Sequence, residues 1–218
     1  MNKKIALDIV NKLKIRYPDA KCSLDFTTPF EMLVAVSLSA QCTDERVNKV
    51  TPFLFLRCKT LEDYISIPIN ELENLVHSCG FYKNKAKNIK QAAQDVLEIF
   101  DGIVPKNHKD LTKLAGVGRK SANVIMLEAF GIASGIAVDT HAKRISNLMG
   151  LSKFKEPEKI EKDLLKIFPK EYLKDVNHLL VWHGRNTCIA RRPKCESCIV
   201  NMYCGNYIKR KKHDKTTY

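Results

Sequence analysis

Apolar residues recur at helical spacing along most of this 218-residue chain. The clearest stretch runs from Lys83 to Phe100, where Ala86, Ile89 and Val96 fall on one face. The residues that follow Glu31 are apolar on nearly every side, which predicts a buried helix. Because no stretch alternates in the manner of a strand, the pattern predicts an all-α fold.

Capping and stop signals divide this pattern into separate helices. Thr28, Pro29 and Glu31 form a capping box with proline at the first helical position. Thr60 and Asn70, each with an acidic residue three positions later, are predicted to start two shorter helices. The other predicted helices are one with Ile5, Ile9 and Leu13, one with Val47, Val50 and Leu54, and further helices at 107–116, 119–131, 139–150, near 157–167 and around 176–183.

A glycine-rich turn separates two of these helices. The segment Gly116-Val117-Gly118 is too rich in glycine to continue the preceding helix, and the next helix begins directly after it. The two helices are therefore predicted to be joined by a tight hairpin. Glycine lets the backbone approach a partner, and the unpaired N–H groups at a helix start suit a phosphate. A packing turn between two helices is the alternative, but the next residues are Arg119 and Lys120, which favours phosphate binding.

The charge of the chain points to polyanionic partners. Lys and Arg exceed Asp and Glu by 13, the sequence pI is about 9.4, and a basic run occupies 209–212. A lysine-rich surface without a nucleic-acid partner is the alternative. The N-terminal segment lacks the apolar core of a signal peptide and no apolar run is long enough to cross a membrane, so we expect a cytosolic protein with no membrane partner.

Four of the eight cysteines are clustered near the C-terminus. Cys188, Cys195, Cys198 and Cys204 are separated by six, two and five residues, which indicates a metal centre that supplies folding energy to this region. The spacing leaves structural zinc and a [4Fe–4S] cluster both open. Arg191, Arg192 and Lys194, between the first two cysteines, are candidate phosphate contacts or solvated surface charges, whereas Cys22, Cys42, Cys58 and Cys79 are predicted to be small core residues.

Four motifs together resemble the endonuclease III family of DNA glycosylases, in the helix-hairpin-helix superfamily. They are LSAQCTD (38–44), LAGVGRKSAN (114–123), VDTH (138–141) and CIARRPKCESCIVNMYC (188–204). The resemblance implies a [4Fe–4S] cluster on the four cysteines. It also implies two helical domains: a six-helix barrel domain at 22–132 that ends in the helix-hairpin-helix, and an iron–sulfur domain made of 1–21 and 133–218.

The resemblance also assigns roles to individual residues. Lys120 matches the nucleophile and Asp139 the catalytic carboxylate, while Gln41 and Phe81 match residues that fill the gap left by an extruded base. The remaining candidate DNA contacts are Asp44, Gly116, Val117, Gly118, Arg119, His141, Arg191 and Lys194. Two departures from the family pattern are Ala115, where a proline often precedes the hairpin, and the loop GIASGIAVD (131–139), which lacks a proline expected there.

These assignments predict a monomeric base-excision-repair glycosylase with AP lyase activity. It would remove oxidised pyrimidines from duplex DNA through a Schiff base on Lys120, and act on abasic sites. A lysine attacks only in its uncharged form, so we expect burial and the neighbouring Arg119 to favour that form.

Two other functions remain open at this point: a non-catalytic, metal-stabilised DNA-binding module, and a glycosylase with another base specificity. The chain ends soon after Cys204, so we expect no additional C-terminal domain of the kind that adenine-specific relatives use.

Overall fold

The local capping signals correctly place most of the helices. The computed structural model describes residues 1–215, with side chains through residue 211. Within these residues every regular element is helical and no strand occurs, so the all-α prediction is confirmed. The chain divides into two compact units, one formed by Cys22–Ile132 (unit 2) and one by Met1–Lys21 together with the residues from Ala133 onward (unit 1).

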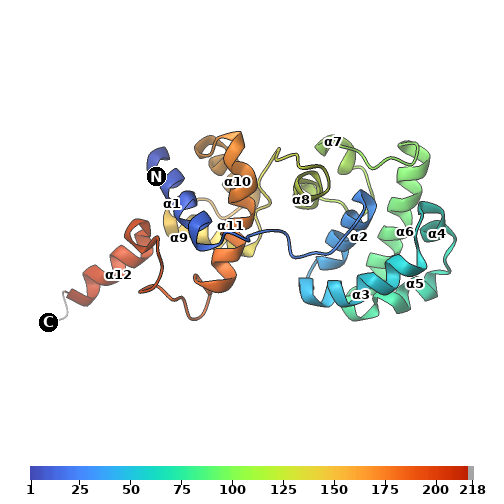
Figure 1. Cartoon of the computed structure of the whole chain (residues 1–218), viewed down its shortest axis with the longest axis horizontal. Helices are drawn as coiled ribbons and strands as arrows, with labels where there is room; N and C mark the ends of the chain where they lie inside the picture. The colour runs from blue at the N-terminus through green and yellow to red at the C-terminus, as the bar shows by residue number, and fades with distance from the viewer. Residues whose placement is uncertain (216–218) are drawn as a thin grey trace. The chain divides into compact units, whose positions relative to one another are not determined.

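Unit 2 is one continuous segment of the chain (Figure 1). Its α-helices are α2 (Pro29–Ser39), α3 (Asp44–Arg57), α4 (Leu61–Ser66), α5 (Ile69–Val76), α6 (Tyr82–Ile99), α7 (His108–Leu111) and α8 (Arg119–Phe130), and the 3₁₀ turn η1 (His77–Cys79) precedes α6. The apolar helix α2 packs against α3, α6 and α8, while α4 and α5 pack against α6. Leu33, Leu38, Ile89 and Ile125 are fully buried at the centre of this core.

Unit 1 combines the first helix with the C-terminal part of the chain. Its helices are α1 (Lys3–Arg16), α9 (Thr140–Met149), α10 (Pro157–Ile167), α11 (Leu173–Asn186) and α12 (Gly205–Lys215), with the 3₁₀ turns η2 (Lys170–Tyr172) and η3 (Asn201–Tyr203). Helix α11 packs against α1 and α9, and α10 also packs against α9. Ile9, Leu13, Ile145 and Leu164 form the centre of a separate apolar core.

Hydrogen bonds at the helix starts follow the sequence signals, with one exception. The Thr28 hydroxyl accepts from the Glu31 N–H at 3.1 Å, and the Glu31 carboxylate accepts from the Thr28 N–H at 3.1 Å, which completes the predicted capping box. The prediction that Asn70 starts a helix is wrong. Helix α5 begins at Ile69, and the Pro68 carbonyl closes its first turn, so Asn70 lies inside the helix.

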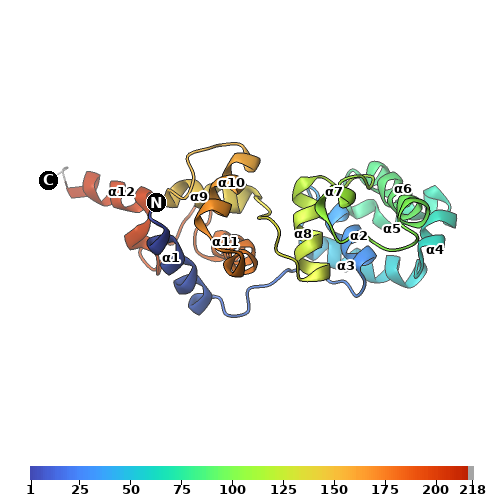
Figure 2. The same ribbon diagram turned by 90° about the horizontal axis from the view of Figure 1, so that it is seen from above.

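Helix α12 was not predicted from the sequence. It packs against α9 and η3 and lies at one end of unit 1 in both views (Figures 1 and 2). The basic run at 209–212 lies within it. The Lys212 side chain and residues 216–218, which belong to the basic tail, lie outside the described residues. Among helices of the described part of the chain, none combines the length and the apolar character needed to cross a membrane.

Candidate active site and cysteine loop

The glycine hairpin connects α7 to α8 in a conformation that requires glycine at one position. Gly116 has φ +76°, in the left-handed region, and a Cβ atom built there would lie 2.9 Å from the Asn88 amide nitrogen. Val117 between the glycines is buried, whereas Gly118 caps α8 with an ordinary φ of −87° and has open space around it. The hairpin therefore anchors one apolar side chain and exposes the backbone on either side of it.

A side chain from α6 holds the entry to this hairpin. The Ala115 N–H donates to Asp95 Oδ2 at 3.2 Å, and Gln91 donates to the other carboxylate oxygen at 2.9 Å. A proline at position 115 has no N–H and could not make the first contact. The first departure from the family pattern thus coincides with a hydrogen bond that fixes the same turn.

We expect Gly116→Ala to destabilise the hairpin much more than Gly118→Ala. The left-handed conformation costs a residue with a side chain about 1–2 kcal/mol, and the contact with Asn88 adds to that cost. Gly118→Ala meets open space and changes only a helix cap, so its cost should stay below about 1 kcal/mol. Urea unfolding of both variants measures the difference, and equal losses of unfolding free energy would contradict this account of Gly116.

Lys120 lies at the second position of α8, directly after the hairpin. Its side chain is exposed, and the helix start beside it carries amide groups that have no partner within the helix itself. The expectation that Lys120 is buried within the protein is therefore wrong for the described chain. The side chain sits on the outer face of α8, while Ala122, Ile125 and Met126 occupy the face toward the core.

Asp139 caps α9 through its side chain. The carboxylate oxygen Oδ1 accepts from the Ala142 N–H at 2.7 Å, a contact that fixes the direction of the carboxylate. Asn177 on α11 bridges the preceding loop, accepting from the Ala137 N–H at 2.8 Å and donating to the Gly135 carbonyl at 3.1 Å. Polar side-chain contacts thus hold the loop that lacks the expected proline.

Gln41 and Phe81 lie on two loops of unit 2 with unusual backbone. Both residues are exposed, and both have positive φ, 53° for Gln41 and 46° for Phe81. Gln41 lies between the end of α2 and the start of α3, and Phe81 immediately precedes α6. Asp44 begins α3 beside the first loop, where its carboxylate accepts from the Ser23 hydroxyl at 2.5 Å.

The His141 side chain packs against α11, within its own unit. A Cβ atom on Gly184 would lie 2.8 Å from the His141 side chain, so glycine allows the histidine to pack closely against α11. Arg144 lies 3.4 Å from His141 Nδ1 and donates to the carbonyls of Gly184 and Cys188 at 3.1 and 2.6 Å. Helix α9 is thereby tied to the start of the cysteine loop.

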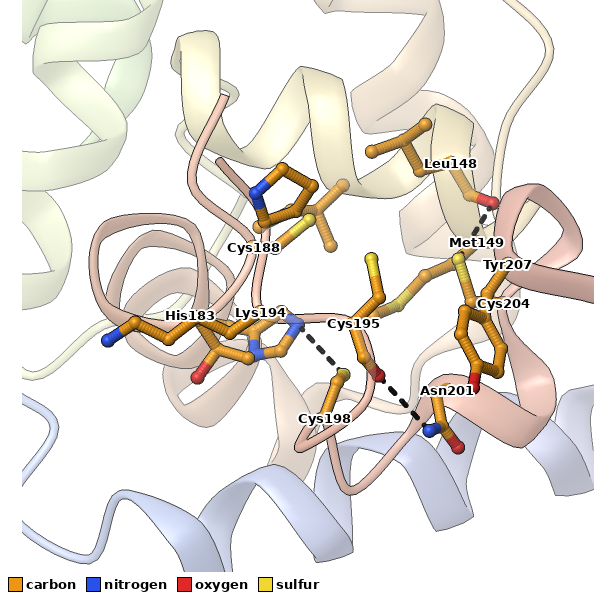
Figure 3. Close-up of a pocket in the computed structure, with 13 residues that line it drawn as sticks. Leu148, Met149, His183, Cys188, Lys194, Cys195, Cys198, Asn201, Cys204 and Tyr207 are labelled. Carbon is orange, nitrogen blue, oxygen red and sulfur yellow. Dashed lines mark hydrogen bonds between the residues drawn. The ribbon is translucent and has the colours of Figure 1, made fainter. Parts of the chain in front are cut away.

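The four clustered cysteines line one pocket that is partly open to solvent (Figure 3). The thiol of Cys198 lies 3.8 Å from Nε2 of the buried His183, whose other ring nitrogen lies 3.3 Å from the Tyr17 hydroxyl. Burial raises the pKa of the Cys188 thiol. Burial likewise raises the pKa of the Cys198 thiol. Positive charge in the cavity would favour the thiolates.

The cysteine thiols are compatible with two kinds of metal centre. Within the described residues, no three His, Cys, Asp or Glu side chains converge closely enough to hold one metal ion. In a zinc site each sulfur lies about 2.3 Å from the same ion, so the sulfurs must crowd together. Four cysteine thiols are ligands that either zinc or an iron–sulfur cluster can use.

The other cysteines are buried or half-buried in unit 2, and the basic residues of the cysteine loop are exposed. Cys58 and Cys79 are buried, and Cys22 and Cys42 are half-buried against the core of unit 2. Arg191, Arg192 and Lys194 are exposed on the loop between Cys188 and Cys195. The Lys194 N–H donates to the Thr187 carbonyl at 2.9 Å, which closes this loop at its base.

Comparison with known proteins identifies the family. Residues 34–170 match the model of the HhH-GPD superfamily of base excision DNA repair proteins. An endonuclease III from Synechocystis sp. is 48% identical over 93% of this chain and 92% of its own length. The chain belongs to the endonuclease III family. It is accordingly an enzyme of base excision DNA repair, a DNA glycosylase with lyase activity.

Solved structures of endonuclease III agree with this family assignment. A non-covalent endonuclease III–DNA complex has a TM-score of 0.91 and 41% identity, and it covers 97% of this chain and 99% of the other. A trapped endonuclease III–DNA covalent intermediate has the same TM-score with 42% identity and the same coverage. The non-catalytic module is therefore excluded as the function of this chain.

Sequence reasoning missed several residues that support the candidate site residues within each unit. Asp95, Asn177 and Arg144 act through contacts with residues far along the chain, and no local pattern marks them. Lys85 could have been found from the sequence, because it lies on the apolar face of α6 that contains Ile89. A lysine at a core position of an amphipathic helix indicates a buried ammonium group with polar partners.

Proposed function

We propose that this enzyme removes oxidised pyrimidines from duplex DNA and cuts the strand at the resulting abasic site through a Schiff base on Lys120. The observation that carries the proposal is the position of Lys120: an exposed amine at a helix start, directly after a glycine hairpin. A chemically matching precedent is the covalent DNA intermediate trapped with an endonuclease III of the same fold. Lysine amines form such bonds with sugar carbons by acting as nucleophiles.

In the first step the Lys120 Nζ attacks C1′ of the damaged nucleoside. The Nζ–C1′ bond forms, the glycosidic bond breaks, and the electron pair leaves with the base. Bound DNA excludes water from the amine, which disfavours its charged form. We propose that Asp139 accepts the proton lost from Nζ and stabilises positive charge on the sugar.

The second step cuts the strand. The C1′–O4′ bond opens as O4′ takes up a proton, which leaves an iminium between Nζ and C1′. Loss of a proton from C2′ then expels the 3′ phosphate with the electrons of the C3′–O bond. Hydrolysis of the iminium frees Lys120, so the enzyme needs no external oxidant or reductant.

We propose that backbone and basic groups hold the DNA for this reaction. The hairpin amides of Gly116, Val117 and Gly118, with Arg119, would bind phosphate oxygens at the start of α8. Gln41 and Phe81 would fill the gap left by the extruded base, because both side chains project from exposed loops. Asp44, His141, Arg191 and Lys194 are further proposed contacts.

We propose that Cys188, Cys195, Cys198 and Cys204 bind a [4Fe–4S] cluster. The four thiols line one pocket, and the chain belongs to the endonuclease III family, which together support the cluster over zinc. The cluster would join the cysteine loop to α9 and α11 and would contribute folding energy, with no part in the proton transfers. We also propose that the enzyme works as a monomer in the cytoplasm, on double-stranded DNA.

Asp139→Asn should separate helix capping from catalysis. Asparagine caps a helix about as well as aspartate, so the thermal midpoint should stay close to that of the wild type. Loss of the carboxylate removes an acid–base group, so the glycosylase rate should fall by about 100 to 10,000-fold. Single-turnover rates on a lesion duplex give this result, and a rate near the wild-type value would show that the carboxylate serves only as a cap.

A panel of lesion duplexes tests the proposed substrate. Borohydride reduction should trap a covalent adduct on duplexes that contain thymine glycol or an abasic site. Duplexes with 8-oxoguanine, alkylated adenine or a mismatched adenine should be cut much more slowly. Faster release of any of these purines than of thymine glycol would support the alternative base specificity, while the adduct on the abasic site tests the lyase separately.

A further inference from the structure

Gln41 and Phe81 have backbone conformations that need support from the surrounding structure. Among the described residues only three non-glycine residues have positive φ, and two of them are these exposed side chains. The left-handed region costs a residue with a Cβ atom about 1–2 kcal/mol. Such conformations persist where neighbouring contacts determine the backbone on both sides.

A buried ammonium group connects the two loops that contain these residues. Lys85 lies in the first turn of α6 and is only 6% exposed. Its Nζ donates to the Leu38 carbonyl at 2.9 Å and to the Cys79 carbonyl at 2.7 Å. Leu38 precedes Gln41 by three residues, and Cys79 precedes Phe81 by two.

The carbonyls that Lys85 contacts explain why a charge is tolerated there. Leu38 lies in the last turn of α2, where carbonyls lack helical partners and the helix dipole favours a cation. Cys79 ends the 3₁₀ turn η1. Burial and the neighbouring Cys42 thiol raise the pKa of the Cys79 thiol to about 11, which places the two loops next to each other at this point as well.

We propose that Lys85 is a positioning residue that holds the Gln41 loop and the Phe81 loop in a fixed relation for insertion into DNA. The inference rests on the proposed function, in which both side chains enter the duplex. Lys85 itself is buried and touches no substrate. It acts by fixing the two carbonyls from which the loops begin.

The same helix provides a matched control. Lys90 also donates its Nζ to two backbone carbonyls, those of Ile65 and Ile67, the latter at 2.7 Å. These carbonyls lie at the connection between α4 and α5, on segments that carry neither Gln41 nor Phe81. Lys85→Met and Lys90→Met thus remove the same kind of contact from one helix, and only the first releases the inserting loops.

The test measures insertion directly. A duplex with a tetrahydrofuran abasic analogue opposite 2-aminopurine becomes more fluorescent when a side chain unstacks the probe base. We expect Lys90→Met to give the wild-type fluorescence rise, and Lys85→Met to need about tenfold or more protein to reach it. In the wild type and in Lys90→Met, adding Gln41→Ala or Phe81→Ala should lower the signal, whereas in Lys85→Met these changes should have little further effect.

Three further measurements decide the outcome. Lys85→Arg keeps donors on a long side chain and should restore most of the signal. If Lys85→Met does not fold, Lys85→Gln is measured instead, since it is too short to reach both carbonyls and should also lose insertion. Equal fluorescence in the folded Lys85 and Lys90 variants overturns the positioning role, whereas absence of a borohydride adduct from wild-type enzyme on an abasic duplex overturns the proposed function itself.

Discussion

Replacing Lys120 with alanine is expected to abolish the borohydride-trapped adduct and the strand cleavage. The amine is the only group that the proposed mechanism bonds to the sugar, and loss of a covalent nucleophile lowers a rate by about a thousandfold or more. Alanine is a strong helix former, and position 120 is exposed near the start of α8, so the fold should not change. Gel separation of trapped adducts, with the circular dichroism of the variant, measures both expectations.

Lys113→Ala is the matched control for this variant. Lys113 is another exposed lysine of the hairpin region, and its Nζ lies 2.7 Å from Asp110. Removing it deletes one positive charge and a surface ion pair worth less than about 1 kcal/mol. The control should weaken DNA binding modestly and keep the adduct, while a full adduct yield from Lys120→Ala would contradict the assignment of the nucleophile.

Cys198→Ser is expected to remove the brown iron–sulfur absorbance and to destabilise unit 1. Between Cys188 and Cys204 only Val200 is a buried apolar residue, so the loop has little core of its own. Structural metal sites contribute about 10 kcal/mol or more to folding in small domains, which indicates the scale of the loss. Visible absorption, iron content and thermal unfolding of the purified variant give the three readouts.

Cys58→Ser provides the comparison for the cluster. Cys58 is a buried thiol in unit 2, where burial raises its pKa and no cluster is proposed. This variant should keep the colour and the iron of the wild type. A colourless wild-type protein that contains zinc would contradict the cluster, as would unchanged iron in Cys198→Ser.

The parts of the fold that depend on local sequence could be predicted. The capping boxes at Thr28 and Thr60 involve residues three positions apart, and their geometry repeats in any protein. The predicted start of α5 was wrong because the backbone carbonyl of Pro68 closes the first turn of the helix. No side-chain pattern in the sequence indicates such a backbone contact. Helix α12 was missed because its sequence is polar on most faces.

The candidate site could be predicted only as far as single residues. The motifs located Lys120 and Asp139, but the exposure of Lys120 depends on how α8 packs against α2. Likewise, Lys85 stands on an apolar face in the sequence, yet its two acceptor carbonyls come from separate loops. Contacts between distant positions are set by tertiary packing, and a single sequence contains no direct record of them.

The division of the chain into units has a consequence for biosynthesis. Unit 2 is encoded without interruption, whereas α1 is synthesised before unit 2 and can pack against α11 only after all of unit 2 has followed. At about 5 to 20 residues per second, the 170 residues from the end of α1 at Arg16 to the end of α11 at Asn186 take roughly 8 to 34 seconds. During that interval Ile9 and Leu13 lack the apolar residues that surround them in the folded unit, so we expect chaperones to be able to bind α1.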